Sequence, residues 1–214
     1  MRLLNKKGLE AVFFDFGGVL AEEGFRNGLR AIADRNGLNP EKVEKSGFEL
    51  IHDTGYVIGH AKEDAFWESL RSKMGVTGDN KMLREEILTR FILRRWLLEI
   101  IPRLKEAGLL LGILSDQTDW LDILNERENF YYLFDYIFNS FHIGKSKRDS
   151  TLFSDIALKI EVIPAKILFV DDHPGNIERA KEKGYNTILY TDRDGLMEGL
   201  EKYFTDLKEY GFSC

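Results

Sequence analysis

The 214-residue chain has little cysteine, little proline and no long apolar run. Its one cysteine, Cys214, cannot form a disulfide within the chain, so we expect a reducing compartment, namely the cytoplasm. No apolar run approaches the ~18 residues that a membrane-spanning helix needs. No signal peptide is recognisable either. These absences predict a protein without a membrane partner.

An excess of positive charge is also absent, since 36 acidic residues outnumber 30 lysines and arginines. The net charge is −6, and the densest basic stretch, residues 145–148, is short. We therefore expect no nucleic-acid partner. The hydrophobic fraction of 43% is ordinary for a globular protein, and the length suits one domain that carries an insertion. We expect a monomer or a homodimer.

The most informative segment is an apolar run that ends abruptly in a carboxylate. Residues 12–14 are followed by Asp15 and then by the glycines Gly17 and Gly18. This pattern predicts a buried strand that delivers Asp15 to the carboxyl edge of a sheet. A second apolar run, residues 167–170, ends in Asp171 and Asp172. Two such strands can converge on one cation or one reaction centre.

Apolar patterning predicts a parallel sheet with helices on both faces. The predicted strands are residues 10–15, 109–114, 136–139, 167–170 and 187–190, and the predicted helices that alternate with them are residues 96–107, 120–128, 152–160 and 177–183 and a tail from Gly195. Residues 21–94 show helical patterning alone. We expect an α/β core, residues 1–20 and 95–214, with residues 21–94 inserted as a helical lid on the carboxylate edge.

The residues near the predicted strand ends suit phosphoryl transfer. They are Asp15, Ser115, Lys147 and the pair Asp171 and Asp172. A carboxylate that attacks a phosphate meets like-charge repulsion, which an ammonium group and a divalent cation would offset. Mg²⁺ prefers oxygen ligands, so two or three carboxylates suffice to hold it.

Four ordered motifs resemble those of the haloacid dehalogenase-type (HAD) hydrolase superfamily. They are residues 15–20 (DFGGVL), the strand 111–114 with Ser115, residues 140–149 (SFHIGKSKRD) and residues 171–176 (DDHPGN). The resemblance implies a Rossmann-like parallel sheet, and residues 21–94 resemble the C1-type helical cap of that superfamily. It further implies a Mg²⁺-dependent phosphatase for a small phosphorylated metabolite such as a sugar phosphate.

The resemblance also implies roles for single residues. Asp15 resembles the nucleophile, which forms an aspartyl phosphate that water then hydrolyses. Ser115 and Lys147 resemble the other catalytic groups. The implied substrate contacts are Gly18, Ser115, Asp116 and Lys147. The implied metal ligands are Asp15, the Gly17 carbonyl, Asp172 as the main acidic ligand, and Asp171 beside it or through water.

The sequence departs from the superfamily pattern at Gly17 and Arg148. The superfamily usually has an aspartate in place of Gly17, which protonates the leaving alkoxide. Members similar to α-glucose-1-phosphatase have glycine there. Gly17 therefore predicts a bias toward leaving groups that need little protonation, such as aryl phosphates. At Arg148, where proline is usual, we expect a local change in the loop.

Several alternatives stay open. Lys145 is the rival of Lys147, and Asn176 either orients the acidic loop or caps a helix. Glu22 or Glu23 could replace the lost acid, although a solvated hinge is the favoured reading. His173 is expected to be an exposed loop residue, with a proton carrier as the alternative. The rival functions are a metal-independent dehalogenase and a non-catalytic binding or regulatory protein.

Overall fold

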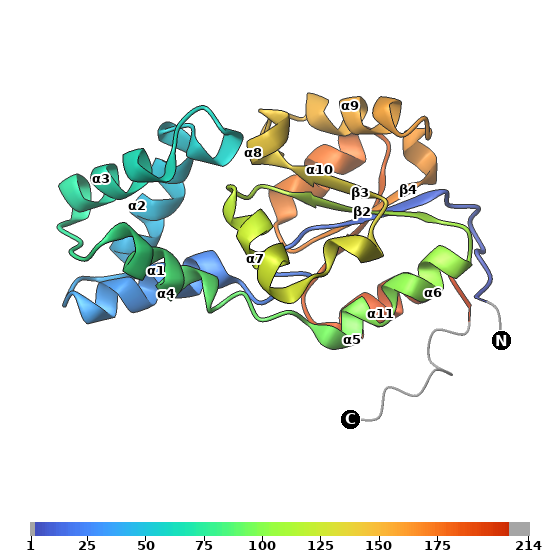
Figure 1. The fold of residues 1–214 in the computed structure, drawn as a ribbon. Helices are drawn as coiled ribbons and strands as arrows, with labels where there is room; N and C mark the ends of the chain where they lie inside the picture. Colours follow the sequence, from blue (N-terminus) through green and yellow to red (C-terminus); the bar gives the residue numbers. More distant parts are fainter. Residues whose placement is uncertain (1–2, 206–214) are drawn as a thin grey trace.

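The computed structural model describes residues 3–205. Five strands form one parallel sheet, which lies at the centre of the core (Figure 1). The strand order is β3-β2-β1-β4-β5. The strands are β1 (Ala11–Phe14), β2 (Leu110–Ser115), β3 (Tyr136–Asn139), β4 (Ile167–Asp171) and β5 (Asn186–Leu189). Each confirms a predicted strand to within one residue at either end, because each apolar run is bounded by polar residues or glycine. Cys214 lies outside the described residues.

Helices cover both faces of the sheet, as predicted for an α/β fold (Figure 1). Phe13 and Phe169 face α9 (Thr151–Lys159) and α10 (Pro174–Glu182). Phe14 faces the other apolar cluster, to which α7 (Trp120–Glu128) and α11 (Arg193–Glu201) contribute. The shorter elements are η1 (Tyr56–Ile58), η2 (Tyr131–Leu133), α8 (Ser140–Ile143) and η3 (Pro164–Lys166). Among residues 3–205, no helix combines the length and apolar character required to cross a bilayer.

The single helix predicted over residues 96–107 is wrong in one respect. The structure divides it into α5 (Arg95–Leu98) and α6 (Ile101–Glu106). Pro102 lies in the first turn of α6 and has no backbone N–H to donate to Leu98. Proline is tolerated at the start of a helix but interrupts its interior, so the break falls just before Pro102.

Four helices form a body beside the sheet (Figure 1). They are α1 (Gly24–Arg35), α2 (Pro40–Asp53), α3 (Glu63–Met74) and α4 (Asn80–Leu88). Their contact with the core includes Trp120 of α7, which stacks on Trp67 of α3 with ring centroids 5.8 Å apart. Trp67 and Trp120 are fully buried, so this contact fixes the helical body against the end of the sheet nearest the predicted site.

The chain enters and leaves the helical body at one place. The backbone N–H of Glu22 donates to Ile92 at 2.9 Å, and that of Arg94 donates to Leu20 at 2.9 Å. The Arg94 guanidinium also donates to the carbonyls of Val19 and Ala21, at 2.7 Å each. Two adjacent crossings of this kind form a double-stranded connection immediately after β1.

Candidate active site

Three neighbouring strands end at the same edge of the sheet and bring polar side chains together. Asp15 follows β1, Ser115 ends β2 and Asp171 ends β4. The backbone N–H of Asp15 donates to the carbonyl of Val170 at 2.8 Å, which extends the pairing of β1 with β4 to the site itself. The parallel register therefore sets the spacing of these groups.

The Asp15 carboxylate is held on both oxygens. Its Oδ1 accepts from Ser115 Oγ and from the backbone N–H of Phe16, both at 2.7 Å. Its Oδ2 lies 2.7 Å from Lys147 Nζ. Burial raises the pKa of Asp15, and the Lys147 ammonium opposes that rise. Ser115 serves this carboxylate and does not cap a helix, since α7 begins five residues later.

Lys147, and not Lys145, lies in the site. Its ammonium is buried, 2.7 Å from Asp15 and 2.6 Å from Asp171. Burial alone would lower the pKa of Lys147, but the carboxylates of Asp15, Asp171 and Asp116 raise it, so the lysine is a fixed cation. Asp116 Oδ1 accepts from the Lys147 backbone N–H at 2.8 Å. Lys145 instead pairs with the exposed Asp155 at 2.6 Å.

The two adjacent aspartates have different surroundings. Asp171 is fully buried and accepts from Lys147, from the backbone N–H of His173 and, with both oxygens, from Asn176. Asn176 thus orients the acidic loop, and His173 caps α10. No side chain within residues 3–205 donates to the Asp172 carboxylate. Burial and the charge of Asp171 raise the pKa of Asp172, which marks a site where a cation would stabilise the ionised form.

The two glycines of the first motif, Gly17 and Gly18, lie against different side chains. Gly18 has φ +82°, and a Cβ there would lie 2.2 Å from Asp172 Oδ2. The loop therefore approaches Asp172 as closely as only glycine permits. A Cβ on Gly17 would lie 3.8 Å from Glu23 Oε2 and 3.3 Å from Phe91 Cε1.

Glu23 is half-buried in the cavity above Asp15, whereas a solvated hinge residue was expected. Its Oε1 accepts from the backbone N–H of Arg26 at 3.2 Å, which caps α1. Burial raises the pKa of Glu23, and the charge of Asp172 adds to the rise. The neighbouring Glu22 is exposed and pairs with Arg94 at 3.1 Å.

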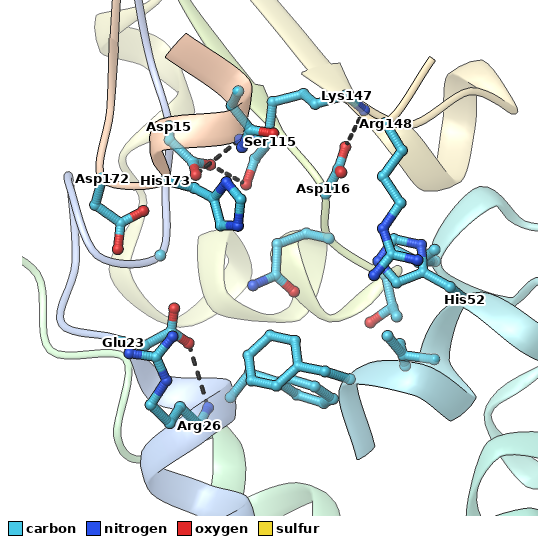
Figure 2. Close-up of a pocket in the computed structure, with 18 of the residues that line it drawn as sticks. Asp15, Glu23, Arg26, His52, Ser115, Asp116, Lys147, Arg148, Asp172 and His173 are labelled. Atoms are coloured by element: carbon cyan, nitrogen blue, oxygen red, sulfur yellow. Dashed lines mark hydrogen bonds and ion pairs between the residues drawn. The ribbon is translucent and has the colours of Figure 1, made fainter. Parts of the chain in front are cut away.

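A cavity of about 350 Å³ lies between the sheet edge and the helical body (Figure 2). Asp15, Ser115, Lys147 and Asp172 line it from the edge of the sheet and its loops, and Glu23 and Arg26 line it from the N-terminal end of α1. This volume suits a small-molecule ligand. The cavity is thus built by both parts of the chain.

Two nitrogen-bearing side chains of this cavity, a neutral imidazole and a guanidinium, were not assigned to the site from the sequence. His52 of α2 and Arg148 lie side by side (Figure 2). Burial and Arg148 lower the pKa of His52 to about 4. Arg148 follows Lys147 directly, so its place in the third motif was a signal for a site residue. His52 is brought to the site by tertiary packing alone.

Arg179 is a supporting residue that the sequence did not reveal. Its Nε donates to the carbonyl of Lys147 at 2.7 Å, and its Nη2 donates to Asn176 Oδ1 at 2.6 Å. It therefore ties the lysine loop to the acidic loop. The available signal was spacing, since Arg179 follows Asn176 by three residues on α10 and so shares its helix face.

Comparison with known proteins supports the fold. No protein-family model matches the chain. A HAD family enzyme from Bacteroides thetaiotaomicron has a TM-score of 0.70 at 21% identity, covering 87% of this chain and 95% of that one. The L-2-haloacid dehalogenase from Xanthobacter autotrophicus, with chloropropionic acid covalently bound, has a TM-score of 0.61 at 18% identity, covering 91% and 83%. The fold predicted from the four motifs, an α/β Rossmann-like HAD fold, is confirmed.

Curated relatives match only in part. Drimenol cyclase of Aspergillus calidoustus is 24% identical over 162 residues, which are 73% of this chain and 30% of the cyclase. Bifunctional epoxide hydrolase 2 of Rattus norvegicus is 25% identical over 117 residues, which are 51% of this chain and 21% of the hydrolase. The chain therefore spans about a third or less of each of these relatives.

Proposed function

We propose that the protein is a Mg²⁺-dependent phosphomonoesterase that acts on a small phosphorylated metabolite, with Asp15 as the nucleophile. The observation that carries the proposal is the environment of Asp15. Its carboxylate faces a small-molecule cavity, is fixed by Ser115 and Lys147, and has the unpaired carboxylate of Asp172 nearby. A HAD-fold structure from Bacteroides thetaiotaomicron holds magnesium and inorganic phosphate, which adds support.

The residues present suit a divalent cation. Asp15, Asp171 and Asp172 each offer one oxygen within 4.8 Å of the others. Oxygen donors of this kind match Mg²⁺. We assign direct contact to Asp15, Asp172 and the Gly17 carbonyl. Asp171 accepts two hydrogen bonds on each oxygen, whereas Asp15 Oδ2 is paired with Lys147 alone and keeps a lone pair for the cation. Asp171 then holds Lys147 and acts on the cation at most through water.

The chemistry divides between attack and charge compensation. Bound Mg²⁺ supplies positive charge that offsets the charge of the phosphate and of Asp15. Lys147 opposes the rise that burial causes in the pKa of Asp15, and it contributes a second positive charge at the phosphate. Ser115 fixes the attacking carboxylate and can turn its hydroxyl to a phosphate oxygen. Gly18 and Asp116 complete the site, Gly18 by allowing close approach and Asp116 by fixing the Lys147 loop.

We further propose that residues 21–94 form a cap on a core of residues 1–20 and 95–214. The support is the double crossing at residues 20–22 and 92–94, together with the cavity-lining residues of α1 and α2. A cap placed there would select the substrate and exclude water during the reaction.

Gly18→Ala should weaken Mg²⁺ binding by about 10- to 100-fold, since a methyl group at this position must displace the Asp172 carboxylate. Gly37→Ala is a matched control, because Gly37 also has a positive φ of +65° but nothing within 4 Å of its Cβ position. Isothermal titration with MgCl₂ measures the effect. Equal Mg²⁺ affinities for the two variants would contradict the role given to Asp172.

A dehalogenase is the second candidate, because it also uses an aspartate nucleophile and solved dehalogenases share this fold. Phosphate release from 4-nitrophenyl phosphate and chloride release from 2-chloropropionate, each with Mg²⁺ and with EDTA, separate the two. We expect phosphate release in Mg²⁺ but not in EDTA, and no chloride release in either condition. Chloride release in EDTA would establish the dehalogenase. A folded protein that releases neither product would favour a binding or regulatory role.

A further inference from the structure

Glu23 projects from the start of α1 toward the end of the cavity where Asp15 and Asp172 lie (Figure 2). Its Oε2 lies 3.8 Å from the position that a Cβ on Gly17 would take. A carboxyl group therefore stands beside the first-motif loop, although residue 17 itself has no side chain.

The reaction needs a proton donor at this end of the cavity. An alkoxide is a poor leaving group at neutral pH, so a positioned acid must protonate it as the P–O bond breaks. The other cavity carboxyls are engaged. Asp15 is the attacking group, Asp116 holds the Lys147 backbone, and Asp172 faces the cation site.

Glu23 differs from these carboxyls in its contacts. Within residues 3–205 it accepts hydrogen bonds only from backbone N–H groups, and one of its oxygens faces the Gly17 loop. Its partial burial favours the neutral carboxylic acid, and this effect exceeds the opposing influence of the Arg26 backbone N–H and charge. His173 is a weaker candidate because it is exposed and its Nδ1 caps α10.

We propose that Glu23 is the general acid and base of the proposed phosphatase reaction, in place of the side chain that Gly17 lacks. This inference rests on the proposed function. In the first step an Asp15 oxygen bonds to phosphorus, the bond from phosphorus to the substrate oxygen breaks, and the Glu23 proton passes to that oxygen, which leaves as an alcohol. Glu23 is then a carboxylate.

The second step restores both residues. The Glu23 carboxylate takes a proton from water while the water oxygen bonds to phosphorus. The bond between phosphorus and Asp15 breaks, inorganic phosphate leaves, and Asp15 is again a carboxylate. Glu23 therefore also controls hydrolysis of the phosphoryl group on Asp15, even when the first leaving group needs no proton.

The test is Glu23→Gln, assayed with two substrates of similar shape. Glutamine keeps the oxygen that caps α1 but cannot donate an acidic proton. 4-Nitrophenyl phosphate releases a phenolate that needs no protonation, whereas 4-nitrobenzyl phosphate releases an alcohol that does. Quenched-flow measurement of the first turnover, with Mg²⁺ and the full chain, isolates the first step. Glu22→Gln is the matched control, because Glu22 is exposed and lies outside the cavity lining.

We expect the first turnover of 4-nitrobenzyl phosphate by Glu23→Gln to slow by about 10²- to 10⁴-fold. The first turnover of 4-nitrophenyl phosphate should keep its rate, while later turnovers slow, which gives a burst of one nitrophenolate per protein. In Glu22→Gln and in the wild-type protein, the first turnovers of 4-nitrophenyl phosphate and 4-nitrobenzyl phosphate should have comparable rates. Gly17 alone predicts that the wild-type protein prefers aryl phosphates. With Glu23 as the acid, we expect that preference in the Glu23→Gln variant and not in the wild type.

Equal slowing of the first turnover with both substrates would show that Glu23 acts only as a helix cap, and no slowing with either would show that it has no part in the reaction. Either result would overturn the inference while leaving the phosphatase intact. Failure of the wild-type protein to hydrolyse 4-nitrophenyl phosphate would instead remove the proposed function itself. Gly17→Asp added to Glu23→Gln should restore part of the lost rate, because an acid then returns to the same loop.

Discussion

Lys147→Met should destabilise the protein by about 3–5 kcal/mol and abolish turnover, because it leaves two buried carboxylates without their cation. The Lys147 ammonium is enclosed between Asp15 and Asp171, at 2.7 and 2.6 Å. Methionine fills a similar volume, so the expected loss arises from charge and not from a cavity. Urea unfolding followed by circular dichroism measures the change in the free energy of unfolding.

Lys145→Met is the matched control for this prediction. Lys145 is partly exposed and pairs with Asp155, whose side chain is 60% exposed. Surface ion pairs contribute about 0–1 kcal/mol, so the control should unfold nearly as the wild type does. Equal free energies of unfolding for the two variants would show that the buried ion pairs do not support the fold as described.

Asp15→Asn should lower turnover of 4-nitrophenyl phosphate by about 10³-fold or more, because an amide is a very poor nucleophile. The fold should persist. The asparagine oxygen can still accept from Ser115 and Phe16, and Lys147 keeps its ion pair with Asp171. Initial rates with saturating Mg²⁺, together with thermal unfolding of the same samples, separate lost chemistry from lost structure.

Asp155→Asn is the control for Asp15→Asn, since Asp155 is exposed and lies outside the cavity lining. It should keep the wild-type rate. If Asp15→Asn keeps more than about a tenth of that rate, Asp15 is not the nucleophile, since loss of a nucleophile costs several powers of ten.

The five strands were predictable because each is a short apolar run with a polar or glycine boundary, and buried parallel strands require such runs. The break at Glu99–Ile100 was missed because the apolar pattern of residues 96–107 continues across it. Pro102 was the signal, and its missing N–H outweighs the pattern.

The sequence predicts which residue types form the site, but it does not predict which side chains contact one another. Lys145 and Lys147 are two residues apart, and the fold of the loop after Gly144 decides which one turns inward. Asp171 and Asp172 are adjacent, and the sequence alone does not show that Asp171 is already saturated by Lys147 and Asn176. Glu22 and Glu23 were both candidates for the missing acid, and the sequence alone does not show that Glu23 faces the Gly17 loop while Glu22 pairs with Arg94.

The most direct test of the account is the rate of 4-nitrophenyl phosphate hydrolysis by the wild-type protein in Mg²⁺, then in excess EDTA, then after Mg²⁺ is restored. The account predicts turnover that falls to the buffer rate in EDTA and returns with the metal. That result would support a phosphatase whose Asp15 and Asp172 hold a cation. An unchanged rate in EDTA, or no turnover by the folded protein with Mg²⁺, would contradict it.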